Sequence, residues 1–331
     1  MPTSIPAFLY SQFFVNIPVP NISFTNQTVI ITGSNTGLGK TAAEQVAGLN
    51  PSKLILAVRN LTAGAEAKKW IESRHPNLPR DVVEVWELDL ASFASVKAFA
   101  ERVQKNLPRL DAISLNAGIS VDTYSAAEGY ERTITVNVLS TFLLALLVLP
   151  KLKETHERFN VNPRLSITAS EVHNWVSFPE RNTPSEQKVI EVMSRPDTKT
   201  MGDRYMASKL MEVLLFQRLR PQINVDKTGV VFTIVNPGFC HSDIMRDMNG
   251  WIVTIFKAIL ARSQDVGGRP ITWSISEGIE KDGKYMHDSR VNDGYLSNYV
   301  TSQEGAEMGE RLWKECVEVF EKNVPGVTNG L

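Results

Sequence analysis

Short apolar segments alternate with longer amphipathic segments along most of the chain from Thr28 onward. The apolar segments are rich in β-branched residues and nearly continuous, which is typical of strands that are buried on both faces. Strands that alternate with helices predict an α/β fold with a doubly wound parallel sheet. The predicted strands are Thr28–Thr32, Lys53–Val58, Asp81–Glu87, Ala112–Leu115, Leu165–Thr168 and Val230–Val235. The predicted helices begin near Gly37, Ala63, Phe93, Tyr130, Tyr205 and Ala306.

Two long stretches, near 171–204 and 239–273, interrupt this alternation. Each follows the carboxyl end of a predicted strand, which is where open α/β sheets bind ligands. Long loops inside a compact α/β unit are usually lids or binding segments. We therefore expect both stretches to form substrate loops.

The first 24 residues form an apolar extension that contains no basic residue, since the first one in the chain is Lys40. A secretory signal peptide needs a positive start, so we do not expect one here. The longest apolar run, Ile134–Pro150, is shorter than a usual membrane span and carries polar side chains, which favours a buried or oligomer-forming helix. We expect no stable membrane span. Peripheral membrane association through the extension or through Trp251–Leu260 stays open as an alternative.

The composition is that of an ordinary globular protein. Of 331 residues, 43% are hydrophobic and 21% are charged, and 35 Lys and Arg balance 36 Asp and Glu. This balance lacks the basic field that drives nucleic-acid binding, so nucleic acid is not an expected partner. Two cysteines and five histidines occur without metal-ligand spacing, so we expect no metal site and no disulfide framework. A reducing, cytoplasmic location fits this cysteine usage best.

A cluster of glycines follows the first predicted strand, where TVIITG runs into SNTGLGK. It places Gly33, Gly37 and Gly39 at the turn into the first helix. A dinucleotide site needs glycines there, because the backbone must turn sharply and approach a pyrophosphate at a helix N-terminus. The alternative is a plain tight turn, but the position between a strand and a helix favours nucleotide binding.

Arg59 ends the second predicted strand, 20 residues after Gly39. An acidic residue at such a position would bind the ribose hydroxyls of NAD, whereas an arginine suits the 2′-phosphate of NADP. The sequence therefore favours NADP(H). NAD(H) stays open because no basic residue precedes Gly37, and Arg59 could instead be a solvated surface residue.

Four residues carry the candidate chemistry. Tyr205 and Lys209 lie four residues apart in YMASK, so a helix presents them on one face. A neighbouring ammonium stabilises a phenolate, which lets a tyrosine exchange protons near neutral pH. Ser170 ends a predicted strand and could bind a substrate carbonyl, while Asn137 stands in an apolar helix, where holding water beside Lys209 would satisfy its amide. The alternatives are a surface pair, a strand-end cap and a core hydrogen bond, respectively.

Several motifs in order resemble the short-chain dehydrogenase/reductase family, and in particular its retinol-dehydrogenase-like members. They are TGSNTGLGK at 32–40, LDL at 88–90, NAG at 116–118, the helix asparagine Asn137, Ser170, YMASK at 205–209 and NPGFCHSD at 236–243. The late segment from DGKYMHDSR to GERLWKE resembles family members of filamentous fungi. Two departures keep the reactive groups: the paired serines of the family read Ala169-Ser170, and Ser242 replaces the usual threonine.

The resemblance implies a single Rossmann-type domain of about seven strands over 25–331, after the extension 1–24. It implies catalytic roles for Ser170, Tyr205, Lys209 and Asn137. It also implies that the cofactor is bound by Gly33, Asn35, Thr36, Gly37, Leu38, Gly39, Arg59, Asp89, Leu90, Asn116, Ala117, Gly118, Tyr205, Lys209, Pro237, Gly238 and Ser242. Family members are often oligomers, so a homodimer stays open.

Residues and resemblance together predict an NADP(H)-dependent oxidoreductase that interconverts a carbonyl and an alcohol on a bulky apolar small molecule. Such a reaction could belong to secondary metabolism. Aromatic and apolar residues in the two long stretches would roof the pocket, although they could equally pack in the core or in a dimer. They are Trp175, Phe178, Phe239, Trp251, Ile252 and Phe256. Two other functions stay open: a non-redox step on the same scaffold, such as that of an epimerase, dehydratase or cyclase, and a catalytically idle nucleotide-binding protein.

Overall fold

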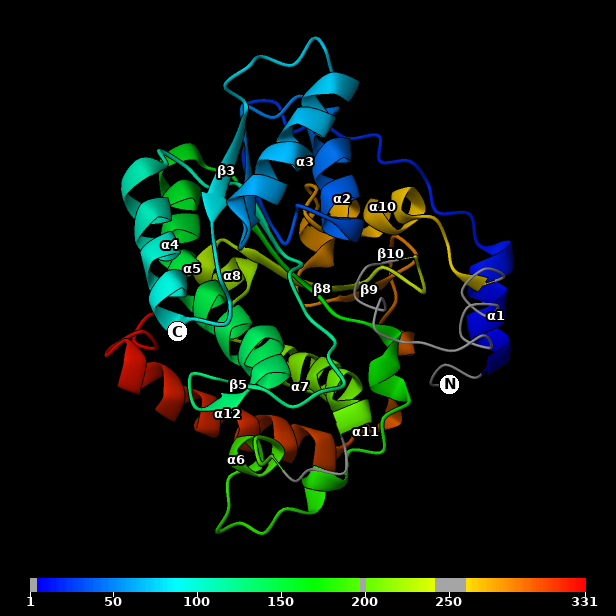
Figure 1. The fold of residues 1–331 in the computed structure, drawn as a ribbon, viewed down its shortest axis with the longest axis vertical. Helices are drawn as coiled ribbons and strands as arrows, with labels where there is room; N and C mark the ends of the chain where they lie inside the picture. The colour runs from blue at the N-terminus through cyan, green and yellow to red at the C-terminus, as the bar shows by residue number, and fades with distance from the viewer. Residues whose placement is uncertain (1–4, 197–200, 242–259) are drawn as a thin grey trace.

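The computed structural model describes residues 5–196, 201–241 and 260–331. Its centre is an eight-stranded sheet with the strand order β3-β2-β1-β4-β7-β8-β9-β10 (Figure 1). All neighbouring pairs are parallel except the last, in which the short strand β10 runs antiparallel to β9. The strands are β1 (Thr28–Thr32), β2 (Lys53–Val58), β3 (Val83–Glu87), β4 (Ala112–Leu115), β7 (Arg164–Thr168), β8 (Val231–Asn236), β9 (Tyr285–His287) and β10 (Arg290–Val291).

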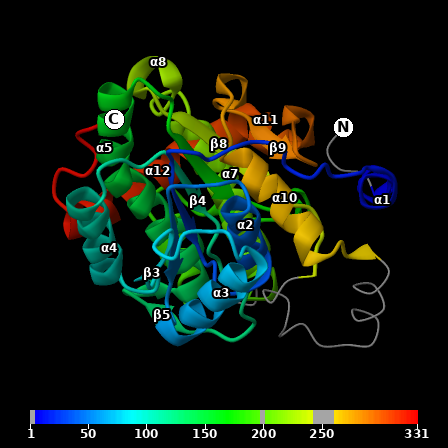
Figure 2. The same ribbon diagram turned by 90° about the horizontal axis from the view of Figure 1, so that it is seen from above.

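Side chains alternate between two apolar layers, one on each face of the sheet, as the pleat of a strand requires. In β1, Ile30 packs into one layer, while Val29 and Ile31 pack into the other. Helices cover both faces (Figure 2). The layer of Ile30 is covered by α4 (Phe93–Asn106), α5 (Thr141–Phe159), α7 (Arg204–Leu219) and α12 (Gln303–Asn323). The layer of Val29 and Ile31 is covered by α2 (Gly37–Ala47), α3 (Leu61–Arg74) and α10 (Gln264–Ser274).

The parallel register brings the carboxyl ends of the strands to one edge of the sheet. Thr32 of β1 pairs with Ala57 of β2, and Thr168 of β7 pairs with Val235 of β8. The strand order reverses direction between β1 and β4, which lie side by side in the middle of the sheet. Open α/β sheets bind their ligands at such a switch point.

All six strands predicted from the sequence are present, with ends that differ by at most two residues. The predicted helices also form, beginning within about four residues of the expected positions. The sheet has one strand more than the expected seven, because β10 adds an antiparallel edge. Neither β9 nor β10 was among the predicted strands.

The stretch 239–273 is not a loop throughout, as we expected from the sequence, because α10 occupies its last part. Ser263 caps this helix by accepting a hydrogen bond from the Val266 amide. Two glycines let α10 approach α2 closely: a Cβ at Gly268 would lie 2.7 Å from Thr41 Oγ1. This close helix packing offsets the low helix propensity of glycine, which had hidden α10 in the sequence.

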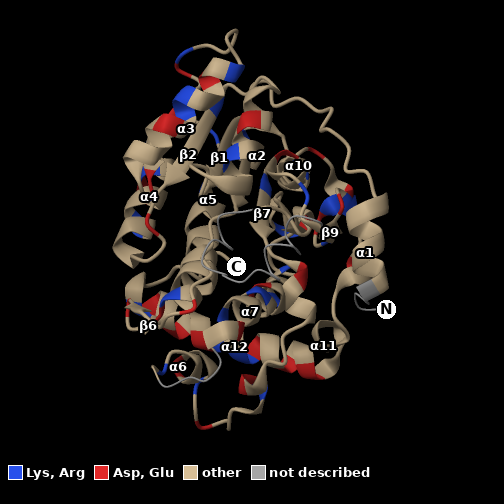
Figure 3. Ribbon diagram, turned by 45° about the vertical axis from the view of Figure 1, so that its right-hand side comes forward, with Lys and Arg blue, Asp and Glu red and all other residues tan. Residues whose placement is uncertain are grey.

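The N-terminal extension forms the helix α1 (Ile5–Phe14), which contains no charged residue (Figure 3). Ser11 donates a hydrogen bond of 2.7 Å to Asp288 Oδ2. The guanidinium of Arg262 bridges the carbonyl oxygen of Ser11 and Asp288 Oδ1. Gln12 donates to the carbonyl oxygen of Phe239 at 2.9 Å. These contacts tie α1 to the segments that follow β8 and β9.

One helical segment among the described residues, 134–159, is long and apolar enough to cross a membrane. It consists of the π-helical segment η1 (Ile134–Ser140) followed by α5, and 89% of its most apolar window is buried inside the protein. The segment is therefore a core helix of this fold, as expected. The described residues also form the short helices α6 (Val189–Met193), α8 (Val225–Thr228) and α11 (Asn298–Thr301), several 3₁₀ turns, and the hairpin of β5 (Ala126–Ala127) and β6 (Tyr130–Glu131).

Candidate active site

The turn from β1 to α2 is shaped by its glycines. Gly33 and Gly37 have positive φ angles of 68° and 54°, a region that side chains disfavour. A Cβ at Gly33 would lie 2.9 Å from the Cα of Ala117, and a Cβ at Gly39 would overlap the Gly33 carbonyl and the Asn116 side chain. Only glycine fits this cradle, which leads into the N-terminus of α2. The backbone here can therefore hold a phosphate group.

The remaining predicted cofactor residues of the first half lie on the same edge of the sheet. Asn35, Thr36 and Leu38 are half-buried or exposed within the turn itself. Arg59 directly follows β2 and is exposed. Asp89 and Leu90 follow β3, and Asp89 accepts a hydrogen bond of 2.9 Å from the amide of Ala91.

The end of β4 is fixed against β1 by two hydrogen bonds. Asn116 donates its side-chain amide to the carbonyl oxygen of Thr32 at 3.0 Å, and the amide of Ala117 donates to Thr32 Oγ1 at 2.9 Å. The next residue, Gly118, lies close to the lysine, because a Cβ there would be 3.3 Å from Asn137 Oδ1 and 3.7 Å from Lys209 Nζ. The structure thus brings the predicted NAG turn next to the predicted catalytic lysine.

The end of β8 contributes Pro237 and Gly238. Gly238 has a φ angle of 82°, and its amide donates to Asn236 Oδ1 at 3.0 Å. Ser242 lies outside the described residues, as do the predicted roof residues Trp251, Ile252 and Phe256.

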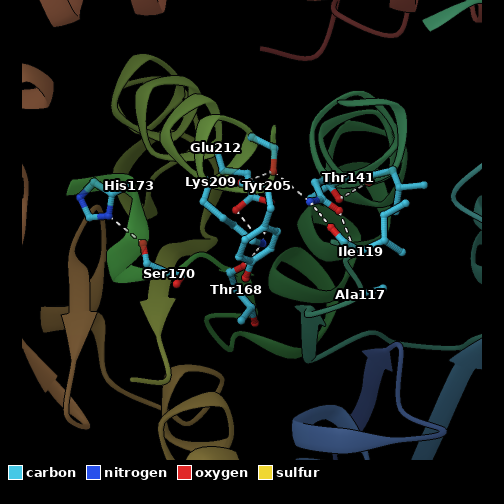
Figure 4. Close-up of polar contacts among 12 residues, drawn as sticks. Ala117, Ile119, Thr141, Thr168, Ser170, His173, Tyr205, Lys209 and Glu212 are labelled. Carbon is cyan, nitrogen blue, oxygen red and sulfur yellow. Dashed lines mark hydrogen bonds and ion pairs between the residues drawn. The ribbon is translucent and has the colours of Figure 1, made fainter. Parts of the chain in front are cut away.

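Tyr205 and Lys209 lie one turn apart on α7, as predicted, with Lys209 Nζ 5.8 Å from the centre of the Tyr205 ring. The ammonium donates to the carbonyl oxygen of Thr168 at 2.8 Å and to both carboxylate oxygens of Glu212 at 2.9 and 3.0 Å (Figure 4). Ser170 follows β7, and its hydroxyl lies near enough to the Tyr205 phenol to lower the pKa of the phenol. Three of the four predicted catalytic residues therefore meet at the carboxyl end of β7.

Asn137 sits in the π-helical segment η1, a local geometry that often marks functional sites. Its Oδ1 accepts from the amide of Ile119 at 2.8 Å, and its Nδ2 donates to the Ile119 carbonyl and to Ser208 Oγ, both at 2.9 Å. The side-chain amide is thus satisfied by protein atoms. These contacts are the core hydrogen bond that the sequence left open as an alternative, and through them Asn137 ties η1 to the end of β4 and to α7.

Burial governs the charges of the catalytic pair. Burial raises the pKa of the Tyr205 phenol. The Lys209 ammonium and the Ser170 hydroxyl oppose this rise, whereas the Glu212 carboxylate adds to it. Lys209 thus lowers the pKa of Tyr205, as we expected from the sequence, but the net shift of that pKa is upward. The pKa of Lys209 is also raised, because Glu212 and Tyr205 outweigh the effect of burial.

A second buried group holds the backbone of Ser170. His173 donates its Nδ1 proton to the Ser170 carbonyl at 2.7 Å, within the short 3₁₀ helix η2 (Glu171–Asn174). Burial lowers the pKa of His173 to about 4, so its imidazole is neutral at neutral pH. Burial also raises the pKa of Glu171 to about 8. A neutral His173 can hold the turn after β7 without adding charge beside Ser170.

Sequence reasoning missed Glu212 and the aromatic side chain of Phe8. A carboxylate in the apolar run from Leu210 to Phe216, three residues after Lys209, was the available signal for Glu212. Phe8 of α1 packs edge-on against Trp175 and Phe239, with ring centres 5.6 and 6.1 Å apart.

Two of the predicted roof residues, Trp175 and Phe239, are therefore joined by the N-terminal extension, which the sequence had set apart. Phe178, a third predicted roof residue, is 1% exposed and belongs to the main apolar core. Of the alternatives left open for these side chains, core packing holds for Phe178.

Comparisons with known proteins agree with this architecture. Residues 27–159 match the family model for the short chain dehydrogenase. The chain is 43% identical to the short chain dehydrogenase/reductase dmxR8 of Cryptosporiopsis sp. (strain 8999), over 97% of this chain and 99% of that protein. It is 38% identical to the short-chain dehydrogenase anuD of Penicillium roqueforti (strain FM164), over 97% of this chain and 84% of that protein.

Solved structures share the fold at lower identity. A short chain dehydrogenase from Shigella flexneri, complexed with NADP, has a TM-score of 0.58 at 19% identity and covers 82% of this chain and 100% of its own. The 3-ketoacyl-(acyl-carrier-protein) reductase from Brucella melitensis, complexed with NADH, has a TM-score of 0.58 at 18% identity, covering 80% of this chain and 96% of its own. With the fungal relatives matched over nearly their whole length, the chain belongs to the short-chain dehydrogenase/reductase family of oxidoreductases.

Proposed function

We propose that the protein interconverts a carbonyl and an alcohol on a bulky apolar small molecule, with NADP(H) as cofactor and Tyr205 as the proton-transfer residue. The observation that carries the proposal is the Tyr205 phenol, which lies beside the hydroxyl of Ser170 and the buried Lys209. This group stands at the same sheet edge as the glycine cradle after β1. An acid, a second donor for the substrate oxygen and a nucleotide cradle are what carbonyl reduction requires.

A bound nicotinamide would supply the hydride in reduction and take it up in oxidation. The chain itself supplies the oxygen site and the proton: Ser170 and Tyr205 bind the carbonyl oxygen, and Tyr205 gives its phenolic proton to that oxygen as the alcohol forms. Because the pKa of Tyr205 is raised, the phenol keeps its proton at neutral pH, which is the form that donates. Reduction should therefore hold its rate through neutral pH, whereas oxidation, which needs the phenolate, should speed up as pH rises.

The cofactor preference rests on Arg59. Its exposed guanidinium directly follows β2, the strand beside the glycine turn of β1. A guanidinium can make two charge-assisted hydrogen bonds to a 2′-phosphate, and a hydroxyl offers no comparable charge. NADP(H) is the favoured cofactor on this ground, and NAD(H) is the competitor in the test below.

The substrate class rests on the aromatic cluster of Phe8, Trp175 and Phe239. Trp175 comes five residues after Ser170, and Phe239 follows the end of β8, so both belong to the stretches proposed as substrate loops. Trp175 is 45% exposed and can offer its ring to a ligand. Apolar, aromatic-lined sites take bulky apolar ligands.

A panel of bulky ketones, aldehydes and alcohols, assayed with NADPH and with NADH by the absorbance of the reduced nicotinamide, tests the proposal. The expected result is stoichiometric NADPH consumption with an apolar ketone or aldehyde and slower turnover with NADH. Product formation without net nicotinamide turnover would instead identify a non-redox step on this scaffold. A protein that binds the nucleotide but converts no carbonyl would contradict the proposal.

A further inference from the structure

Glu212 is a buried carboxylate that the proposed reaction does not use. Glu212 is 2% exposed and Lys209 is 3% exposed, so both charges are withdrawn from water. The three protons of the Lys209 ammonium face three acceptors, the Thr168 carbonyl and the two oxygens of Glu212. Every donor of the ammonium is therefore matched by an oxygen of the chain itself.

Other charges contribute little to this pair. Among the described residues, the charged or titratable groups that act on Lys209 are Glu212 and Tyr205, and Lys209 is the one that acts on Glu212. On the elements packed against this part of α7, each of the following titratable groups either pairs with a residue other than Lys209 and Glu212 or has a pKa shift that neither of them causes. The pKa of Glu171 in η2 responds to burial and to Asp288, and that of His173 in η2 to burial and to the Ser170 carbonyl. In α12, Glu310 pairs with Arg218, and Glu315 accepts from the amides of Val189 and Ile190.

Burial of an ammonium favours its neutral form, by several pKa units for a fully buried lysine. Burial alone lowers the pKa of Lys209, and the charge and hydrogen bonds of Glu212 raise it above its ordinary value. Without Glu212, the remaining hydrogen-bond acceptor of the Lys209 ammonium among the described residues is the neutral Thr168 carbonyl. A neutral lysine could no longer favour the phenolate of Tyr205.

We propose that Glu212 is a positioning residue that keeps Lys209 protonated and holds its ammonium at the carboxyl end of β7. Its carboxylate acts through Lys209 and does not touch the substrate. The pairing also sets a competition, because any further acceptor, such as a ribose hydroxyl, has to share a proton already directed at Glu212 or Thr168. The consequence for catalysis rests on the proposed function, whereas the protonation state of Lys209 does not.

The protonation state can be measured directly in protein labelled with ¹³C at the lysine Cε. The Lys209 signal is assigned by its disappearance in Lys209→Arg, and its shift is followed by NMR from about pH 6 to about pH 9. In the wild type, the signal should stay that of an ammonium throughout. In Glu212→Gln, which keeps the shape but loses the charge, the Lys209 midpoint should fall by at least about two pKa units. A Lys209 signal in Glu212→Gln that titrates as in the wild type would overturn the proposal.

The kinetic arm follows the same logic. Glu212→Gln should oxidise an alcohol at nearly the wild-type rate at about pH 6, where Lys209 is protonated in both proteins, and at least about tenfold more slowly at about pH 9, because oxidation needs the Tyr205 phenolate that a charged Lys209 favours. Glu212→Asp keeps the charge with a shorter reach, so it should restore most of the alkaline activity. A pH-independent loss in Glu212→Gln would contradict the proposal.

Glu315→Gln is the matched control, because it also neutralises a buried carboxylate but lies away from Lys209. It should leave both the NMR titration and the pH profile unchanged. If Glu212→Gln does not fold, the Lys209 midpoint in Glu212→Met, which also removes the charge, decides instead: a value at or above that of the wild type would count against the proposal. If the wild type turns over no nicotinamide, the proposed function fails, while the NMR titration still decides the role of Glu212.

Discussion

The Lys209–Glu212 pair allows a stability prediction that is independent of any substrate. Lys209→Met keeps an unbranched side chain of similar length but leaves Glu212 buried without its cation. Breaking a buried ion pair by removing one partner costs about 3–5 kcal/mol, because an uncompensated charge stays buried. Removing both charges in Lys209→Met/Glu212→Gln should recover most of that loss, since buried pairs can often be replaced by neutral groups at little cost.

The pH dependence of this loss follows from the pKa of Glu212, which burial raises from an ordinary 4.5 to about 7 in the wild type. A carboxyl with a raised pKa in the folded state destabilises the fold as pH climbs from the unfolded pKa to the folded one. Lys209 lowers the pKa of Glu212, so Lys209→Met raises it further. Wild type and variant therefore lose stability in parallel up to about pH 7, and above that pH only the variant continues to lose.

Urea unfolding of the four proteins of this cycle, at about pH 5.5 and about pH 8.5, measures both effects. We expect the deficit of Lys209→Met to be small at the lower pH and about 2 kcal/mol at the higher one, because the variant loses about 1.4 kcal/mol per pH unit above pH 7 while the wild type stays level. The double variant, which lacks the carboxyl, should show neither this loss nor the decline of the wild type below pH 7. A deficit of equal size at both pH values would mean that lost packing dominates. It would refute the assignment of the loss to a stranded carboxylate.

Three further predictions concern the proposed activity. Tyr205→Phe should lower the carbonyl reduction rate by about 10²- to 10⁴-fold, the usual worth of a proton donor, with nucleotide binding by fluorescence titration unchanged; near wild-type turnover would exclude the phenol as the donor. Arg59→Ala should raise the KM for NADPH by about 10- to 100-fold and leave that for NADH nearly unchanged, while Arg80→Ala, an exposed arginine before β3, should change neither. Phe8→Ala should raise the KM for bulky apolar substrates by about tenfold, because the contacts of its ring with Trp175 and Phe239 are lost. Tyr10→Ala, on the exposed face of α1, should leave this KM unchanged. Equal effects of the two variants would argue against a pocket role for Phe8.

Local patterns in the sequence were sufficient to predict the strands and helices whose signals are strong. The six predicted strands are continuous apolar runs, and a strand buried on both faces leaves that signature without any knowledge of its neighbours. By contrast, β9 is the three-residue segment Tyr285–His287 and owes its extended form to pairing with β8. Similarly, α10 contains two glycines and a proline, and it becomes a helix because those glycines fit against α2. Both depend on tertiary contacts that local propensity does not contain.

The candidate site likewise contains residues that local sequence patterns predict and residues that depend on tertiary contacts. The spacing of Tyr205 and Lys209 within one helix predicts a shared face, and strand-end positions predict a shared sheet edge for Ser170 and the glycine turn. Phe8 could not be found by such rules, because its contacts with Trp175 and Phe239 join segments more than 150 residues apart. The amide partners of Asn137 could not be predicted either, because Ile119 and Ser208 come from other elements.

The electrostatics of the catalytic pair shows why spacing alone is insufficient to predict chemistry. A lysine one turn from a tyrosine suggests a phenol of lowered pKa, yet the net pKa shift of Tyr205 is upward because the phenol is buried and the Lys209 charge is shared with Glu212. A carboxylate that neutralises the ammonium weakens its pull on the phenol, since opposite charges at similar distances cancel. The same carboxylate keeps the lysine charged at a depth where it would otherwise lose its proton. The pair therefore favours a protonated Tyr205 near neutral pH, and with it the direction of carbonyl reduction.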